Sequence, residues 1–274
     1  RTIDTHIKNI RQKIENDVFW DVLRLWNELK PAIPLAETEL GGIFTSIGVD
    51  TWGVDFALVD SNGELLGNPH HYRDSRTEGV MEKVLEKVSK EEIHFRTGIQ
   101  FMRINTLYQL YSLALKKRAV LDSAHRFLMI PDLFDFWLSG SMVSEFTDST
   151  TTQFYNPNIR NWDFELLEKL DLPTHFLPEI IEPGTSLGRI SRGLANELNV
   201  RKEISVVATA CHDTASAVAA APLENGNSAY ISSGTWSLVG AEVEKPVISK
   251  KSLEYNFTNE GGVFGKFRLL RNVQ

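Results

Sequence analysis

The chain has 274 residues and a formal net charge of −7 at pH 7. Hydrophobic residues make up 42% of it, charged residues 24% and aromatic residues 10%, and these proportions exclude a disordered, collagen-like or coiled-coil chain. The length fits one large domain or two modest ones, and it is enough to bury a sizeable core without cross-links.

The acidic balance argues against a nucleic-acid partner, because little in the sequence would neutralise a phosphate backbone. The longest basic cluster, Lys116-Lys117-Arg118, is short and typical of a solvated helix face. The single cysteine, Cys211, excludes a disulfide framework and predicts a reducing, cytoplasmic location. No apolar run approaches the roughly 20 residues that span a bilayer, so we expect neither a membrane segment nor a signal peptide.

The chain opens with an expected helix followed by a connector. Residues 17–30 carry apolar side chains at helical spacing, with Asp17 placed to cap the helix. Pro31 and Pro34 are expected to end this helix, and residues 35–42 are predicted to connect it to the next element.

A short meander of strands is expected next. Residues 43–49 have the composition of a buried strand, residues 50–53 are predicted to form a turn or bend, and residues 54–59 a second strand. Ser61-Asn62-Gly63 is a hairpin signal.

The middle of the chain is predicted to be helical. Helix patterns cover residues 77–89, 104–118, 131–138 and 163–170. The Thr-rich residues 147–152 are predicted by their composition to form a loop.

Strands return toward the end of the chain. Residues 204–210 are predicted to form a strand, residues 214–222 a helix, and residues 228–231 and 236–239 two further strands. Strands mixed with long helices indicate an α/β fold with a mixed sheet, and the tight hairpins indicate that part of the sheet is antiparallel.

The segment from Val206 to Ala217 carries the clearest chemical signal, because an apolar strand runs directly into His212-Asp213-Thr214 and small residues then open a helix. A strand end facing a helix N-terminus is the usual ligand crevice of an open α/β sheet. A carboxylate there is expected to stay ionised and could accept a proton from a substrate hydroxyl. An isolated Asp at this position is more often a helix cap, and here the flanking polar residues favour a site.

Two glycine-containing segments give weaker signals. In residues 230–237, hydroxyl groups and Gly234 sit in a tight turn that could aim donors at phosphate oxygens, although turn chemistry alone explains them. In residues 50–55, Gly53 permits close approach of a ligand to the backbone. Trp52 beside it fits an apolar platform for a sugar and a buried residue at a strand bend equally well.

Residues 72–77 and Cys211 carry little functional signal. The first segment holds two Arg and one Asp, and a capped helix start with surface ion pairs is the favoured interpretation. Cys211 and His212 are neighbours in a strand and point to opposite faces, which excludes a thiol–imidazole pair, so Cys211 is expected to be a small buried apolar group. No zinc-type ligand spacing is found, and no metal ligand is predicted in the chain.

Together these segments resemble the FGGY family of carbohydrate kinases, and most closely its rhamnulokinase branch. The Thr-Trp-Gly-Val-Asp and His-Asp-Thr-Ala-Ser-Ala strings are the most specific features. The resemblance runs from about residue 43 to the end and rests on residues 46–55, 72–77, 98–101, 105–110, 212–217, 232–237 and 258–262.

The resemblance implies an actin-like, ribonuclease-H-like ATPase fold with two such domains around a cleft. It implies an enzyme of rhamnose catabolism that transfers the γ-phosphoryl group of ATP to O1 of L-rhamnulose with Mg²⁺, as a monomer or homodimer. Asp213 is the implied catalytic base, and Thr235 the implied contact to an ATP phosphate. The implied sugar contacts are Gly53, His212, Asp213, Thr214 and Asn272.

The sequence departs from the family pattern at both ends. Neither the Asp-x-Gly phosphate loop nor most of the second, nucleotide-binding domain is found in it, so the chain is expected to be part of something longer and inactive alone. We expect residues 1–243 to form the sugar-binding domain without its first strands, and residues 244–274 to begin the nucleotide-binding domain. A kinase for another ketose or polyol (fuculose, xylulose or glycerol) and a non-catalytic sugar-binding module stay open as alternatives.

Overall fold

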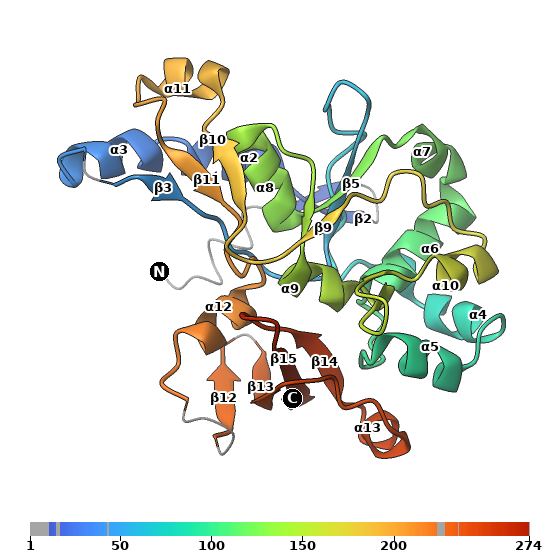
Figure 1. The fold of residues 1–274 in the computed structure, drawn as a ribbon. Coiled ribbons are helices and arrows are strands. Elements are labelled where there is room, and N and C mark those ends of the chain that lie inside the picture. Colours follow the sequence, from blue (N-terminus) through green and yellow to red (C-terminus); the bar gives the residue numbers. More distant parts are fainter. Residues whose placement is uncertain (1–10, 15–16, 43, 224–227, 235, 274) are drawn as a thin grey trace.

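A computed structural model describes residues 11–14, 17–42, 44–223, 228–234 and 236–273, and it has the expected α/β architecture (Figure 1). The helices are α2 (Val22–Leu29), α3 (Ala32–Glu39), α4 (Val80–Leu85), α5 (Lys90–Thr97), α6 (Thr106–Lys116), α7 (Arg118–Ser123), α8 (Ile130–Ser139), α9 (Phe146–Ser149), α10 (Phe164–Lys169), α11 (Arg192–Leu198), α12 (Asp213–Ala219) and α13 (Lys250–Glu254), with 3-10 turns η1 (Ser75–Thr77) and η2 (Thr150–Thr152). The strands are β1 (Arg11–Ile14), β2 (Asp17–Trp20), β3 (Ser46–Ile47), β4 (Phe56–Val59), β5 (Arg126–Met129), β6 (Ser144–Glu145), β7 (Tyr155–Asn156), β8 (Asn161–Trp162), β9 (Ile180–Ile181), β10 (Ser186–Arg189), β11 (Ser205–Val207), β12 (Tyr230–Ser233), β13 (Ser237–Val243), β14 (Thr258–Gly261) and β15 (Phe267–Val273).

A mixed three-stranded sheet with the order β10-β11-β3 carries the segments that meet at the candidate site. β11 pairs with β3 in parallel and with β10 antiparallel, so the predicted mixed sheet is confirmed. Because parallel neighbours end at the same edge, the residues after Ile47 and after Val207 leave the sheet together.

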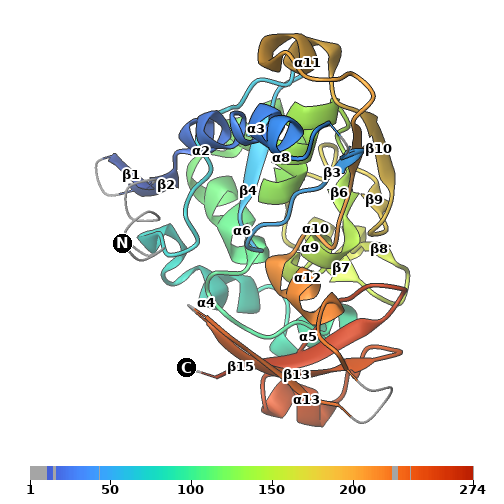
Figure 2. The same ribbon diagram turned by 90° about the vertical axis from the view of Figure 1, so that its left-hand side faces the viewer.

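A second sheet is fully antiparallel and has the order β12-β13-β15-β14. Figure 2 shows it as a layer along one side of the helical part, with α12 between the two. Val218 of α12 packs on this sheet against Tyr230, Leu238 and Leu270. The sheet therefore continues on both sides of residue 243, where the domain division was predicted, and that division stays a prediction.

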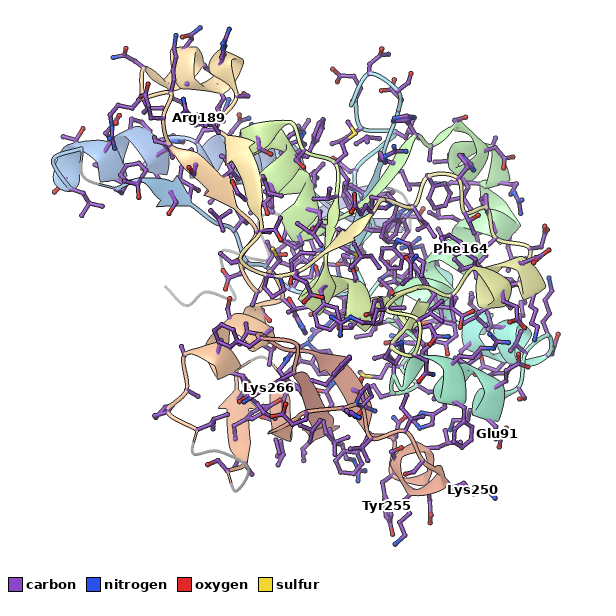
Figure 3. All side chains as sticks on the ribbon, in the orientation of Figure 1. Glu91, Phe164, Arg189, Lys250, Tyr255 and Lys266 are labelled. Atoms are coloured by element: carbon purple, nitrogen blue, oxygen red, sulfur yellow. The ribbon has the colours of Figure 1, made fainter. Side chains whose placement is uncertain are left out.

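The largest hydrophobic cluster lies among α4, α6, α10 and the β4–β5 pair. Aromatic rings fill it, with Phe127 in contact with Phe56, Phe154, Trp162 and Phe176. In Figure 3 the labelled side chains of Phe164, Glu91, Lys250 and Tyr255 lie instead on the outer edge. Burial of this aromatic cluster contributes a large share of the hydrophobic stabilisation.

Several predicted elements are confirmed with shifted ends. The helices expected at 77–89, 104–118, 131–138 and 163–170 contain α4, α6, α8 and α10. Gly140 ends α8 in the left-handed conformation, as a helix C-terminus favours. The predicted hairpin turn at residues 61–63 lies between Val59, the last residue of β4, and Leu65, and these two residues form an isolated antiparallel bridge.

The predicted helix over residues 17–30 is wrong in its first part. Residues 17–20 form β2, and α2 starts at Val22 with Asp21 as its cap, whose side chain accepts from the Arg24 amide at 3.1 Å. Asp17 therefore caps nothing here. The four residues of β2 also fit the start of a helical spacing, because so short a segment cannot separate the two periods.

The predicted connector over residues 35–42 is also wrong, since α3 covers Ala32–Glu39. Pro31 is the N-cap of α3 and Pro34 lies in its first turn. The amides of these positions have no acceptor within the helix, so proline loses no hydrogen bond there. The same two prolines thus begin a helix instead of only ending one.

The predicted loop over residues 147–152 is wrong as well. This segment forms α9 and η2, and every residue from Thr147 to Thr152 is buried. Thr and Ser side chains satisfy one another's backbone here, as in the bonds from Thr150 Oγ1 to the Thr147 carbonyl and from Thr152 Oγ1 to the Ser149 carbonyl. Composition suggested solvent exposure, but local side-chain-to-backbone bonds allow burial.

Among the residues that the structure describes, no helix has the length and apolar character that a bilayer crossing requires.

Candidate active site

Backbone pairing brings two distant segments together at the edge of the three-stranded sheet. Thr51 and His212 form an isolated parallel bridge. The Thr51 amide donates to the Cys211 carbonyl at 2.9 Å, and the Asp213 amide donates to the Thr51 carbonyl at 2.8 Å. The chain after β3 and the chain after β11 are thereby held side by side.

Asp213 is the first residue of α12, and its side chain is 57% exposed. The N-cap position belongs to His212, which makes no side-chain cap bond. The helix-cap explanation of Asp213 is therefore wrong. Its carboxylate Oδ1 instead accepts a hydrogen bond from Thr214 Oγ1 at 3.1 Å, and this leaves the group open to a ligand.

Desolvation raises the pKa of Asp213 above its ordinary value, and the nearby Asp50 adds to this, while hydrogen bonds from Thr214 oppose the shift. From its place at a helix N-terminus we expect the carboxylate to stay ionised, because the helix dipole favours a lowered pKa. The net change in the pKa of Asp213 is instead upward. A raised pKa makes a carboxylate a stronger proton acceptor, because its conjugate acid holds the proton more firmly.

Gly53 lies against three side chains of this site. A Cβ atom on Gly53 would lie 3.0 Å from Thr151 Cγ2, 3.1 Å from Asp148 Oδ1 and 3.2 Å from His212 Nε2. The absence of a side chain allows these three side chains to approach the backbone, and the predicted approach of a ligand to Gly53 stays a prediction.

The amide and ring of His212 make polar contacts with four neighbouring residues. Its amide donates to Thr147 Oγ1 at 3.2 Å. Its ring Nδ1 lies 3.1 Å from Arg268 Nη2 and 3.4 Å from Glu260 Oε2, and its Nε2 lies 3.6 Å from Asp213 Oδ1. Burial and the charge of Arg268 hold the pKa of His212 well below its usual range, so the ring is neutral.

A group of buried carboxyls lies behind His212. Burial raises the pKa of Asp132 and of Asp135 to about 8 and that of Glu145 to about 7. Burial and these neighbours also raise the pKa of Asp148. Glu145 Oε2 accepts from the Cys211 amide at 3.1 Å, which ties this cluster to the backbone that carries the site.

Cys211 is fully buried, as predicted, and burial raises the pKa of its thiol well above the usual value. Its Sγ lies 3.9 Å from Asp135 Oδ2. A thiol in this setting stays protonated and is a poor nucleophile.

Trp52 serves the structure of the site and not an open platform. Its indole Nε1 donates to Asp55 Oδ2 at 3.0 Å, and its ring lies 4.2 Å from that of Trp20. Asp55 is fully buried and also accepts from Trp20 Nε1 and Gln109 Nε2. Burial raises the pKa of Asp55 to about 6 despite these bonds.

The segment at 72–77 is a capped turn, as favoured, but of its three charged side chains only Arg73 is exposed. Asp74 accepts from the Arg76 amide at 2.8 Å and from the Val18 amide at 2.6 Å. Both Asp74 and Arg76 are buried, and Arg76 Nη2 donates to Gln109 Oε1 at 2.5 Å. Arg73 lies over the rings of Tyr72 and Trp236.

Of the remaining implied contacts, only Thr214 is placed at the site, through its bond to Asp213. Asn272 lies on β15, where its Nδ2 contacts Met102 Sδ at 3.5 Å and its Oδ1 is buried without a partner. Thr235, the predicted phosphate contact, lies outside the described residues, and next to it the Gly234 amide donates to the Trp236 carbonyl.

Sequence reasoning missed Asp148, Glu260 and Arg268 as neighbours of the site. Glu260 belonged to a stretch noted only for its family resemblance, and Arg268 is one of two arginines in its strand, with Phe267 and Leu269 on either side. A single buried charge in a strand is the signal that could have marked Arg268, because such a charge needs a partner.

The described residues contain no group of three His, Cys, Asp or Glu side chains that could hold a metal ion. We therefore assign no metal ligand to them. Mg²⁺ in phosphoryl-transfer sites is bound largely by substrate phosphates and water, with one or two carboxylates.

Residues 3–220 match the family described as "FGGY family of carbohydrate kinases, N-terminal domain". The chain is 43% identical over 260 residues to a rhamnulokinase of Oceanobacillus iheyensis, covering 95% of this chain and 54% of that protein. It is 42% identical over 259 residues to a rhamnulokinase of Pectobacterium carotovorum, covering 94% and 51%. The chain thus spans about half the length of the curated relatives it matches.

Solved structures share the fold at low identity. A xylulose kinase from Lactobacillus acidophilus superimposes with a TM-score of 0.85 at 19% identity, over 96% of this chain and 53% of that one. A glycerol kinase from Plasmodium falciparum, solved with ADP, gives 0.82 at 16% identity, over 96% and 54%. These likenesses confirm the predicted actin-like fold, and the sequence matches go further: the chain belongs to the FGGY family of carbohydrate kinases.

Proposed function

We propose that the full-length protein is an ATP-dependent kinase that phosphorylates O1 of L-rhamnulose. The observation that carries the proposal is the exposed Asp213 carboxylate at the start of α12, beside the half-buried side chain of His212 and the backbone of Gly53. The sugar assignment is supported by relatives named rhamnulokinase at 42–43% identity.

In this proposal Asp213 accepts the proton of the O1 hydroxyl as O1 attacks the γ-phosphorus. The O1–H bond breaks, a P–O1 bond forms, and the bond to the β-phosphate oxygen breaks to release ADP. Such transfers need positioning and charge neutralisation more than covalent catalysis. A carboxylate with a raised pKa suits the role of proton acceptor.

His212, Gly53 and Thr214 would position the sugar. The Gly53 backbone and His212 Nε2 lie close together beside Asp213, so a sugar oxygen bound next to them would meet both the ring and the carboxylate of Asp213. Asn272 and Thr235 complete the proposed contacts, to the sugar and to an ATP phosphate. Mg²⁺ would arrive with ATP and neutralise its phosphate charge.

The proposal also covers the division into domains and the activity of the isolated 274-residue chain. Residues 1–243 would hold the sugar and residues 244–274 would begin the nucleotide-binding domain. The chain by itself is then expected to bind sugar without turnover. ADP release by the isolated chain would overturn that expectation.

The substrate is tested with a coupled ADP-release assay on the full-length protein. L-rhamnulose is expected to give the highest kcat/KM in a panel that includes L-fuculose, D-xylulose and glycerol. A higher kcat/KM for another member of the panel would overturn the assignment of L-rhamnulose as the substrate and leave the assignment of a kinase in place. Calorimetric sugar binding with no ADP release from any member would favour a non-catalytic binding module.

A further inference from the structure

Arg268 is fully buried, and its Nε and Nη2 contact groups at the site, whereas its Nη1 has no hydrogen-bond partner among the described residues. On β15, its Nε donates to the Gly261 carbonyl at 2.8 Å, and its Nη2 lies 3.2 Å from Glu260 Oε2 and 3.1 Å from His212 Nδ1. Glu260 on β14 and Arg268 on β15, two strands of the antiparallel sheet, thus contact the ring of His212. Figure 1 shows both strands below α12.

A guanidinium has donors only, so it fixes the role of its partner. If Arg268 Nη2 bonds to His212 Nδ1, then Nδ1 must present its lone pair. Burial and the Arg268 charge hold the pKa of His212 well below its usual range. A neutral imidazole with an accepting Nδ1 carries its hydrogen on Nε2.

Glu260 offers the competing arrangement. Its Oε2 lies 3.4 Å from His212 Nδ1, which is longer than an ordinary hydrogen bond, and it lies closer to Arg268 Nη2. The distances therefore favour an ion pair between Glu260 and Arg268, with the imidazole accepting from the guanidinium.

The hydrogen on Nε2 would lie on the side of the ring that faces Asp213 and Gly53. Nε2 lies 3.2 Å from where a Cβ of Gly53 would be and 3.6 Å from Asp213 Oδ1. A ring donor placed there can bind a substrate oxygen next to the carboxylate, whereas the other tautomer would present a lone pair to that carboxylate.

We propose that Arg268 is a positioning residue that holds His212 as the Nε2–H tautomer, so that His212 acts as a hydrogen-bond donor to substrate beside Asp213. The role of His212 in binding substrate rests on the proposed function. The assignment of the tautomer does not rest on it, because the tautomer is a property of the protein without substrate.

The direct test is ¹⁵N NMR of the full-length protein with ¹⁵N-labelled histidine, without substrate. The His212 signals are assigned by their loss in His212→Gln. The proposal predicts a pyridine-type Nδ1 and a pyrrole-type Nε2 in the wild type. A pyrrole-type Nδ1, donating to Glu260, overturns it whatever the enzyme's activity.

Variants separate Arg268 from its surroundings. Arg268→Met leaves Glu260 buried and unpaired, and this can prevent folding, so the double variant Glu260→Gln/Arg268→Met is measured beside it. Both are expected to lose the fixed tautomer and to give mixed or reversed ring signals. The matched control Glu260→Gln keeps the guanidinium and is expected to keep the Nε2–H signals.

Kinetics then test the functional consequence. In the double variant, kcat/KM for the sugar is expected to fall about 10- to 100-fold, as when a histidine loses the group that orients it, with a rise in KM for the sugar and no rise in KM for ATP. Wild-type ring signals in the double variant overturn the proposal. The predicted signals in a protein that phosphorylates no sugar would overturn the proposed function alone.

Discussion

Thr51 and His212 pair as a parallel bridge beyond the last regular residues of β3 and β11. The bridge lies four residues past Ile47 and five past Val207, and backbone hydrogen bonds from Thr51 to Cys211 and from Asp213 to Thr51 hold the two segments together. Asp213 makes one of these bonds and Gly53 follows two residues after Thr51, so the bonds fix where both stand.

The hydroxyl of Thr214 is expected to tune the proton acceptor. Its bond to Asp213 Oδ1 lowers the carboxyl pKa against the rise caused by desolvation. Thr214→Val removes the bond and should raise that pKa further. The acidic limb of the kcat/KM–pH profile is then expected to move to higher pH.

Thr214→Ser is the matched control for that measurement, because it keeps the hydroxyl and loses only a methyl group. It should leave the acidic limb in place. An acidic limb that moves to lower pH in Thr214→Val would contradict the assignment of the limb to Asp213.

Gly53→Ala is expected to weaken sugar binding. The added Cβ would meet Asp148, Thr151 and His212 at 3.0–3.2 Å, closer than a Cβ tolerates without movement of its neighbours. We expect KM for the sugar to rise about tenfold, which is about 1.4 kcal/mol. Gly193→Ala, on α11 with nothing within 4 Å, is the control and should be neutral or slightly stabilising. An unchanged KM in Gly53→Ala would remove Gly53 from the site.

The Asp55 carboxylate holds the 50–55 segment in place. It accepts from Trp20, Trp52 and Gln109 side chains in a buried setting. Asp55→Ala leaves these donors without an acceptor and is expected to lower the free energy of unfolding by about 3–5 kcal/mol, measured by chemical denaturation. Asp55→Asn keeps the shape and one acceptor, so it should cost less. Equal losses in the two variants would argue against the hydrogen bonds as the cause.

Asp135 is expected to make stability depend on pH. Burial, with Asp132 and Glu145 nearby, raises its pKa to about 8. The folded protein therefore keeps a proton that the unfolded chain releases near pH 4, so the free energy of unfolding falls as the pH rises from about 4 to about 8. Asp135→Asn removes this titration, so its stability relative to the wild type should increase as the pH rises from about 4 to about 8 and be greatest at pH 9.

Asp171→Asn removes an exposed carboxylate and controls for the change in net charge. Denaturation curves of the three proteins at pH 5 and pH 9 decide the matter. A wild type that keeps the same stability relative to Asp135→Asn at pH 9 as at pH 5 would show that the buried carboxyl is ionised in the fold at both pH values.

The sequence predicted the elements whose pattern is long or sharply punctuated. α6 follows from eleven residues of helical spacing, and α8 from a proline at its start and Gly140 at its end. Short elements failed: β2 has only four residues, and its pattern fits two periods. The Thr-rich segment failed because hydroxyl groups that bond to the local backbone can be buried, and composition does not reveal those bonds.

The centre of the site was predictable because Asp213, His212 and Gly53 lie in segments with unusual local composition. Arg268 and Glu260 were not, since their role depends on how the second sheet lies against α12 and not on their neighbours in sequence. Tertiary contact also explains why Trp52 faces Asp55 and Trp20 instead of a ligand.

The most direct test of the account is the turnover of Asp213→Asn in the full-length protein with saturating L-rhamnulose and ATP. If Asp213 accepts the proton of the sugar hydroxyl, kcat should fall about 10²- to 10⁴-fold, with the Kd for the sugar by calorimetry staying close to that of the wild type. Turnover equal to that of the wild type would contradict the account.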